Sequence, residues 1–359
     1  MLSKNFTYEA AGVDRKLRAE SKKALNYLKE TYNFSHYGDI VELPYGKIFP
    51  FRDGYLDLVI EGVGTKVLVA QLANKYDTIG IDGVAVAVND VIRSGARPLA
   101  VADNIHAQVS EPVLVEQWMK GIAQGAAEAE CVVPSGEIGD VDELIRGLVQ
   151  GKGFDMVFAS VGEVSQENVI YGREIEPGDA IIGLRSSGIH SNGISLARKI
   201  LFKDWGGKYG AHEVQDELGR ELVLEVLEPT KIYVKSVRAV ARDVQIKAAV
   251  HITGDGYLKF YRLIEFSKGI GFEFNVFDPQ PIFALIQKTG KDLGGKIADE
   301  EMFKTFNMGW GFALVVDKKD KEDVLTILEK ADGKAEQIGR ITNTGKVKIH
   351  YRHKRMMLA

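Results

Sequence analysis

Three glycine-rich segments carry the side chains of this 359-residue chain that are best suited to chemistry. They are residues 61–66 (Glu-Gly-Val-Gly-Thr-Lys), residues 186–193 (Ser-Ser-Gly-Ile-His-Ser-Asn-Gly) and residues 251–256 (His-Ile-Thr-Gly-Asp-Gly). Each follows a strand-like run of residues. Glycines at such a junction let backbone N–H groups approach a ligand, and the start of a following helix favours an anion. Three such junctions, each with a charged or titratable side chain, favour phosphate and metal chemistry.

The first segment combines the groups that a nucleotide's phosphates and metal require. Gly62 and Gly64 allow close approach of the backbone. Thr65 can donate a hydrogen bond, Lys66 can supply positive charge, and Glu61 can hold Mg²⁺. The spacing matches neither the P-loop pattern nor G-x-G-x-x-G, so a plain glycine turn fits the sequence equally well.

The second segment places hydroxyls, an amide and an imidazole between a strand and a helix. Ser187, Gly188 and Asn192 can contact a phosphate, and His190 can donate or accept a proton. A helix start capped by Ser191 or Asn192 is the simpler alternative. In the third segment, His251, Thr253 and Gly254 offer a similar set of groups.

Two carboxylates outside these segments are candidate metal ligands. Asp90 lies in the apolar helical pattern of residues 80–94, where a carboxylate is expected to be paired or to face a polar cleft. An ordinary position on the outer face of the helix is equally compatible. Glu137 follows the apolar run of residues 131–134 on a glycine turn, where either a metal ligand or a plain surface turn fits.

The elements that must position these groups alternate between helix and strand, which predicts an α/β or α+β fold. Helices are expected at residues 14–32, from 66 onward, and at 80–94, 112–129, 194–201 and 319–331. Strands are expected at residues 55–60, 97–107, 131–134, 154–164, 180–184, 246–250, 310–316, 334–341 and 346–351. Residues 33–53 are interpreted as irregular. A connection at residues 173–179 divides the chain into domains at 1–172 and 173–359.

Composition narrows the class of protein. The net charge is −4 and the pI about 6.1, which does not favour nucleic-acid binding. The one basic cluster, residues 352–355, is interpreted as a solvated tail. Cys131 is the single cysteine, so no internal disulfide can form. No window approaches the ~18 apolar residues of a membrane span, and we expect a cytoplasmic protein without membrane partners.

Taken together, the motifs resemble one enzyme family over nearly the whole chain. The matching stretches are residues 8–14 (Tyr-Glu-Ala-Ala-Gly-Val-Asp), 62–66, 77–82 (Asp-Thr-Ile-Gly-Ile-Asp), 88–90 (Val-Asn-Asp), 186–193, 228–236 (Glu-Pro-Thr-Lys-Ile-Tyr-Val-Lys-Ser), 251–254 and 304–309 (Lys-Thr-Phe-Asn-Met-Gly). Each stretch alone is weak evidence for a family, but together, in this order and at these separations, the stretches are specific for one. The sequence resembles the aminoimidazole ribonucleotide synthetases, the phosphoribosylformylglycinamidine cyclo-ligases of purine biosynthesis.

The resemblance implies a two-domain fold, in which an N-terminal domain dimerises through its sheet and a C-terminal α/β domain follows. It implies a homodimer that binds ATP in a cleft involving the dimer interface. It also implies a reaction in which ATP, with Mg²⁺, phosphorylates the amide oxygen of formylglycinamidine ribonucleotide. A nitrogen then attacks the activated carbon and phosphate leaves, which closes the ring.

The resemblance also assigns roles to individual residues. The catalytic candidates are Lys66, Asp90, Glu137, His190 and His251. The ATP and phosphate candidates are Gly62, Gly64, Thr65, Lys66, Ser187, Gly188, Asn192, Thr253 and Gly254. The metal candidates are Glu61, Asp90 and Glu137. Glu61 stands where the family usually has Asp, and Asp255 stands where it usually has Gly.

Other functions remain as alternatives. The same superfamily includes ATP-using enzymes such as thiamine-monophosphate kinase. A member of a different class would be a non-catalytic nucleotide-binding scaffold, which would be expected to lose several of the candidate catalytic groups together. Functional side chains remain at positions 61, 90, 137, 190 and 251, which favours the enzyme.

Overall fold

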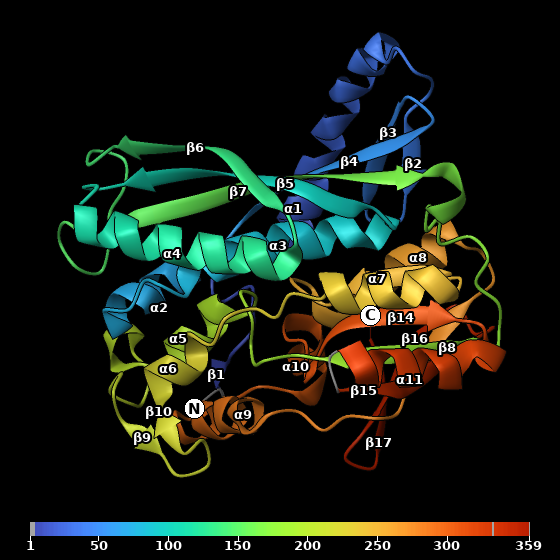
Figure 1. Cartoon of the computed structure of the whole chain (residues 1–359). Helices are drawn as coiled ribbons and strands as arrows, with labels where there is room; N and C mark the ends of the chain where they lie inside the picture. The colour runs from blue at the N-terminus through green and yellow to red at the C-terminus, as the bar shows by residue number, and fades with distance from the viewer. Residues whose placement is uncertain (1–3, 332–333, 359) are drawn as a thin grey trace.

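The computed structural model describes residues 4–331 and 334–358. Two β-sheets lie one above the other, with helices packed between and around them (Figure 1). The upper sheet belongs to the first half of the chain and the lower sheet to the second half. This arrangement confirms the predicted mixed α/β class with two sheet-centred halves.

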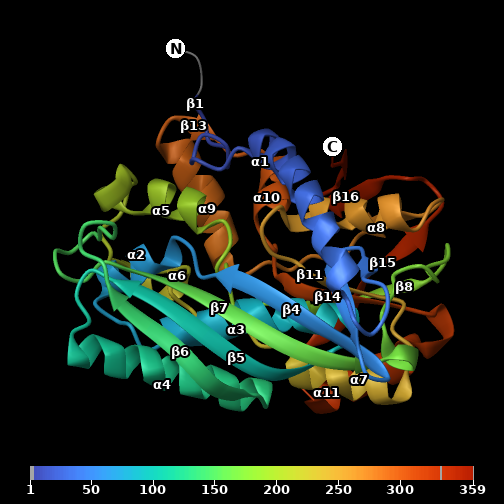
Figure 2. The same cartoon turned by 90° about the horizontal axis from the view of Figure 1, so that it is seen from above.

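The first sheet has six strands in the order β2-β3-β4-β7-β5-β6. Their bounds are β2 Val41–Leu43, β3 Gly46–Phe51, β4 Gly54–Gly62, β5 Arg97–Ala107, β6 Val132–Asp140 and β7 Phe154–Ser165. All neighbours are antiparallel except β5 and β6. Helices α3 (Ile79–Val91) and α4 (Pro112–Ala129) cover one face of this sheet (Figures 1 and 2).

Glycines allow α3 to lie close to its neighbours. A Cβ atom at Gly83 would come within 1.9 Å of the Phe158 ring, and one at Gly80 within 2.5 Å of the backbone of α4 at Ile122. Every residue of α3 is buried. This helix is therefore fixed between the first sheet and the second half of the chain.

The second sheet has seven strands in the order β11-β14-β8-β15-β12-β16-β17, and β12 with β16 is its one parallel pair among the described residues. Their bounds are β8 Ala180–Arg185, β11 Ala248–His251, β12 Gly271–Phe274, β14 Trp310–Val316, β15 Ala335–Thr342, β16 Val347–Tyr351 and β17 Lys354–Met357. Buried apolar residues fill β8 and β14, so these two strands form the core of the sheet.

The remaining helices connect and flank these sheets. In the first half they are α1 Arg15–Ser21, α2 Lys66–Ala73 and the 3₁₀ segments Lys22–Phe34, Ile92–Ser94 and Gln166–Asn168. In the second half they are α5 Ile194–Leu201, α6 Leu222–Val226, α7 Val234–Asp243, α8 Phe260–Phe266, α9 Pro281–Asp292, α10 Asp299–Thr305, α11 Lys321–Ala331 and the 3₁₀ segments Lys203–Trp205, Gly256–Lys259 and Lys318–Asp320. No helix in the described ranges is long and apolar enough to cross a membrane.

Two short strand pairs complete the fold. They are β1 (Lys4–Asn5) with β13 (Gly295–Lys296), and β9 (Val214–Gln215) with β10 (Arg220–Glu221). The first pair joins the start of the chain to its second half. The domain boundaries at 1–172 and 173–359 therefore stay a prediction, since the N-terminal segment packs against residues beyond position 290.

Most predicted elements are confirmed, but several differ. The predicted helix at 14–32 is α-helical only to Ser21, although Asp14 caps it as expected by accepting from the Leu17 N–H. Residues 33–53 were expected to be irregular but contain the β2–β3 hairpin. The basic residues at 352–355 lie at the β16–β17 turn, where Lys354 approaches Asp299 to 3.2 Å.

Candidate active site

Helix α3 brings the first half of the chain into contact with three loops of the second half. Asp82 binds Ser191 of the second glycine-rich segment, Asp82 and Asn89 bind residues 230–233, and Asp90 binds His251 at the end of β11. Asn89 accepts from the Tyr233 N–H at 2.9 Å and donates to the Lys231 carbonyl at 2.8 Å. One buried helix thus sets the positions of the loops that carry the candidate groups.

The three glycine-rich segments meet at a small hollow. Its lining comes from all three segments and from α3: Glu61, Gly62, Val86, Asp90, Ser191, Asn192, His251 and Thr253. Gly254 lies beside it, and a Cβ atom there would approach Asn192 Oδ1 to 3.1 Å. The shared site expected from three separate junctions is therefore present in the tertiary structure.

Asp90 is buried at the floor of this hollow with two partners. Its Oδ1 lies 2.7 Å from His251 Nδ1, and its Oδ2 lies 2.7 Å from the Arg93 guanidinium. Burial alone would raise the pKa of Asp90. The charge of Arg93, the hydrogen bond from His251 and the charge of Lys259 together hold that pKa well below its usual range. Asp90 is thus a fixed anion, paired as the sequence analysis allowed.

His251 is neutral near pH 7 in this environment. Burial lowers its pKa to about 4, against the raising effect of Asp90. Because the ionised Asp90 can only accept, His251 Nδ1 carries the proton and Nε2 keeps a lone pair. Nε2 has no hydrogen-bond partner within the described ranges. His251 therefore presents a free proton acceptor at the site.

Glu61 also lines this hollow and lies near the charged groups of Asp90, Lys259 and Arg93. Although its side chain keeps access to solvent, partial burial and the nearby Asp90 carboxylate raise its pKa, while Lys259 and Arg93 oppose that rise. Two carboxylates so close to each other fit a shared cation, because a divalent ion would offset their repulsion. No group of three or more metal-binding side chains occurs among the residues that the structure describes.

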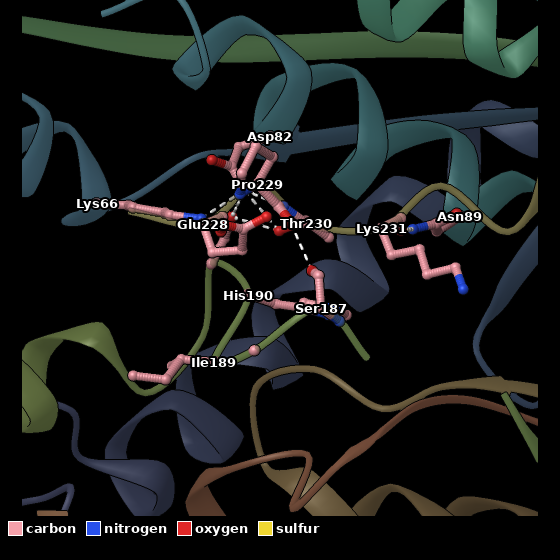
Figure 3. Close-up of polar contacts among 12 residues, drawn as sticks. Lys66, Asp82, Asn89, Ser187, Ile189, His190, Glu228, Pro229, Thr230 and Lys231 are labelled. Atoms are coloured by element: carbon pink, nitrogen blue, oxygen red, sulfur yellow. Dashed lines mark hydrogen bonds and ion pairs between the residues drawn. The ribbon is translucent and has the colours of Figure 1, made fainter. Parts of the chain in front are cut away.

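Lys66, a predicted phosphate ligand, has its side chain enclosed by protein groups. Its side chain is fully buried, and Nζ donates to Asp82 Oδ1 at 2.8 Å and to the Glu228 carbonyl at 2.5 Å (Figure 3). Asp82 Oδ1 also accepts from Ser191 Oγ and from the Thr230 N–H and hydroxyl. The expected phosphate contact is not supported, because the ammonium is enclosed in an ion pair away from the hollow.

His190 lies next to the hollow but does not line it. Its Nε2 accepts from the Ser187 N–H at 3.1 Å, and its backbone has a left-handed φ of 66°. Burial and the neighbouring His251, Lys66 and Lys231 lower the pKa of His190 well below its ordinary value. The proton of the neutral ring is therefore on Nδ1, which has no partner within the described ranges. His190 holds a buried donor close to the site.

Three of the other predicted phosphate contacts, Thr65, Ser187 and Gly188, already bond to protein groups. Ser187 Oγ donates to the Pro229 carbonyl at 2.5 Å, and Thr65 Oγ1 lies 3.0 Å from Ser195 Oγ. The Gly188 carbonyl accepts from Asn307 Nδ2 at 2.8 Å. Gly64 has the left-handed φ of 69° that a glycine turn needs. These contacts hold the first and second segments in place, and their phosphate roles stay predictions.

Glu137 was expected on a glycine turn after residues 131–134, and this turn is wrong, whereas its catalytic and metal roles stay predictions. It lies within strand β6 and pairs with Asn104 of β5. Three strand spacings, about 14 Å, separate it from β4. Glu61 pairs with the inward-facing Phe158, whereas Asn104 and Glu137 face outward, so the two glutamates lie on opposite faces of the sheet. Glu137 does not belong to this hollow.

Sequence reasoning missed two basic residues of the site, Arg93 and Lys259. Arg93 is one helical turn beyond Asp90, a spacing that could have suggested the pair. Lys259 Nζ donates to the His251 carbonyl at 3.1 Å and to Thr253 Oγ1. Burial lowers the pKa of Lys259 to about 8, against the raising effect of Asp90. No local pattern marks this lysine, because only the 3₁₀ turn brings it back to residue 251.

Comparisons with known proteins agree with the geometry. Residues 51–164 match the N-terminal domain of the AIR synthase related proteins, and residues 176–352 match their C-terminal domain. The phosphoribosylformylglycinamidine cyclo-ligase of Pyrococcus horikoshii is 38% identical over 331 residues, which are 90% of this chain and 92% of that protein. The enzyme of the same name from Methanocaldococcus jannaschii is 37% identical over 369 residues, covering 98% and 99%.

A solved structure shares the fold at lower identity. Hydrogenase maturation protein HypE, in a crystal structure with ATP, superimposes with a TM-score of 0.56 at 16% identity, covering 97% of this chain and 95% of that one. The sequence matches extend over both halves of the chain. This chain therefore belongs to the AIR synthase related protein family and, within it, is similar over its full length to the phosphoribosylformylglycinamidine cyclo-ligases.

Proposed function

We propose that this chain is an ATP-dependent cyclo-ligase that converts formylglycinamidine ribonucleotide to aminoimidazole ribonucleotide in purine biosynthesis. The amide oxygen of the substrate attacks the γ-phosphorus of ATP and releases ADP. A substrate nitrogen then attacks the activated carbon, the carbon–oxygen bond breaks, and phosphate and one proton leave. The observation that carries this proposal is the hollow in which Glu61, Asp90, His251 and Thr253 meet.

The two histidines have complementary proton states for this chemistry. His251 Nε2 is a free acceptor, held in its tautomer by Asp90, and is suited to take the proton of the attacking nitrogen. His190 Nδ1 is a free donor within its buried loop, suited to stabilise negative charge on a phosphate or oxyanion after a small movement of that loop. Both roles are part of the proposal.

ATP and Mg²⁺ are the proposed co-substrate and cofactor. The ATP complex of HypE, a protein of the same fold, supports nucleotide binding. Mg²⁺ in phosphoryl-transfer sites commonly uses one or two carboxylates plus the phosphates themselves, and Glu61 and Asp90 supply such a pair. When bound, the ion would neutralise charge on the transferring phosphoryl group. The longer Glu61 side chain reaches Asp90 from the neighbouring strand.

Substrate-dependent ADP release tests the function directly. Purified protein with ATP, Mg²⁺ and formylglycinamidine ribonucleotide is expected to form aminoimidazole ribonucleotide and ADP in equal amounts. A parallel reaction with thiamine monophosphate is expected to give no ADP above background. ADP formed only with thiamine monophosphate would identify a kinase instead, and nucleotide binding without turnover of either substrate would identify a scaffold protein.

We also propose a homodimer formed through the first sheet. Leu58, Ile60 and Val132 are exposed on the face of this sheet opposite α3 and α4, as their pairing with Val161, Ala159 and Ala100 places them. Exposed apolar groups gathered on one sheet face favour association. Glu137 lies on this same face, so a second protomer is the neighbour that it would meet.

Sedimentation of the wild type and of Ile60→Asp tests the dimer. We expect a dimer for the wild type and a folded monomer for the variant, with Val214→Asp, an exposed change in β9 of the second half of the chain, as the control. A monomeric wild type at micromolar concentration would contradict the proposal. The cytoplasmic location and the absence of nucleic-acid partners stay predictions.

A further inference from the structure

Several contacts fix the backbone of the third glycine-rich segment beside the hollow. Gly256 has a φ of 48°, and a Cβ atom there would lie 2.2 Å from the Phe303 carbonyl oxygen. The Gly256 N–H donates to the Thr253 carbonyl at 2.8 Å. Asp255, with a left-handed φ of 72°, lies 3.2 Å from the guanidinium Nε of Arg15. The position of Thr253 in the hollow wall is therefore set by contacts on both sides.

Lys259 completes this arrangement from behind Thr253. Its Nζ donates to the Thr253 hydroxyl oxygen and to the His251 carbonyl, and its own carbonyl accepts from the Tyr45 hydroxyl at 3.2 Å. Within residues 4–331 and 334–358, Lys259 is the single hydrogen-bond partner of Thr253 Oγ1. A hydroxyl has one proton and two lone pairs, so an ammonium that occupies a lone pair leaves the proton free to point elsewhere.

We propose that Lys259 is a positioning residue that makes the Thr253 hydroxyl a donor toward the hollow, where the acceptor is a phosphate oxygen of the bound nucleotide. This inference rests on the proposed ATP-dependent function. The ammonium cannot accept a hydrogen bond, so the hydroxyl proton must turn away from it. A donor oriented before the ligand arrives loses little freedom on binding and is polarised by the adjacent positive charge.

A double-mutant cycle on the full chain separates this role from direct contact. The variants are Thr253→Val, Lys259→Met and the two together, and the probe is the β,γ-imido analogue of ATP with Mg²⁺. Loss of a hydrogen bond to a charged group weakens binding by about tenfold or more. We expect about a tenfold rise in Kd for each single variant and no further rise, within twofold, for the double variant. Lys259→Arg and Thr253→Ser should restore Kd to within about threefold of the wild type.

Each other outcome overturns the proposal. Single effects that multiply to about a hundredfold in the double variant would mean that Lys259 contacts the nucleotide independently of Thr253. Single variants that lower the thermal midpoint but leave Kd unchanged would mean a purely structural contact. KM for ATP should rise with Kd while kcat changes less, which a folding defect alone does not produce.

The same experiment distinguishes this inference from the proposed function. A wild-type protein that does not bind the ATP analogue contradicts the function itself. A wild-type protein that binds it and turns over formylglycinamidine ribonucleotide, but whose cycle is additive, contradicts only the role of Lys259.

Discussion

Helix α3 carries two charged clusters that differ in what surrounds them. At one end, Asp82 and Lys66 form an ion pair in which both side chains are fully buried (Figure 3), and Asp82 Oδ1 also accepts from Ser191 and Thr230. At the other end, Asp90 pairs with His251 and Arg93 at the floor of a hollow that Glu61 also lines. The first cluster is balanced by one lysine and closed, whereas the second gathers carboxylates where a ligand can enter.

The comparison shows that two aspartates of one helix can have different roles, because different groups surround them. A buried lysine and aspartate whose partners are all protein groups fix the second segment through Ser191 and fix residues 228–230 against the helix. A carboxylate beside a free imidazole nitrogen keeps unused capacity for a proton or a cation. We therefore expect the Asp82 end to control stability and the Asp90 end to control turnover.

The largest expected effect is on turnover at the open end. Asp90→Asn keeps an acceptor for His251 Nδ1 but removes the charge that fixes its tautomer and holds a cation. We expect kcat/KM to fall by about 10³-fold, as for other losses of general base and electrostatic groups. Steady-state kinetics with thermal unfolding of the same sample measures both properties. Near-normal activity would show that Asp90 has no part in the reaction.

The closed end should respond in stability rather than in nucleotide affinity. Lys66→Met leaves the Asp82 charge buried and unpaired, which costs about 3–5 kcal/mol of unfolding free energy. The KM for ATP of the folded protein is expected to stay within about twofold, and adding Asp82→Leu should recover part of the stability. Urea unfolding and ATP kinetics give the two measurements. A tenfold rise in KM with unchanged stability would restore Lys66 as a phosphate ligand.

The smallest expected effect is on the pH dependence of stability, and it comes from Asp57, a buried carboxylate near Asp90. Burial raises the pKa of Asp57 to about 6, above its unfolded value of about 3.9. Between these values the folded state binds more protons, so this group's contribution is full below pH 4 and is lost as pH rises through about 6. The shift corresponds to about 3 kcal/mol, because Asp57 is buried.

Asp57→Asn removes this pH dependence. Relative to the wild type, the variant is expected to gain about 2–3 kcal/mol of unfolding free energy between pH 4 and pH 7. Urea unfolding of both proteins at four pH values measures the difference. Glu167→Gln, an exposed change, serves as the control. If the unfolding free energies of wild type and Asp57→Asn changed with pH in parallel, the pKa of Asp57 would not be raised in the folded protein.

The sequence alone determined the local parts of this molecule. Hydrophobic periodicity gave α4, α5, β5 and β14 with the observed bounds, since one face or both faces of each element are buried. The glycine-rich segments were located correctly because glycine marks a break between strand and helix. The β2–β3 hairpin was missed because its strands are short and Pro50 interrupts the pattern.

Only the tertiary structure decided which of these groups share a site. Glu137 lies in a strand, on the face opposite Glu61, because its pairing with distant β5 overrides the local turn signal. Lys66 pairs with Asp82, which is 16 positions away in the sequence. Asp90 pairs with His251, which is 161 positions away. Sequence patterns report nearest neighbours along the chain, whereas the charge that surrounds a buried group comes from residues that only folding brings near.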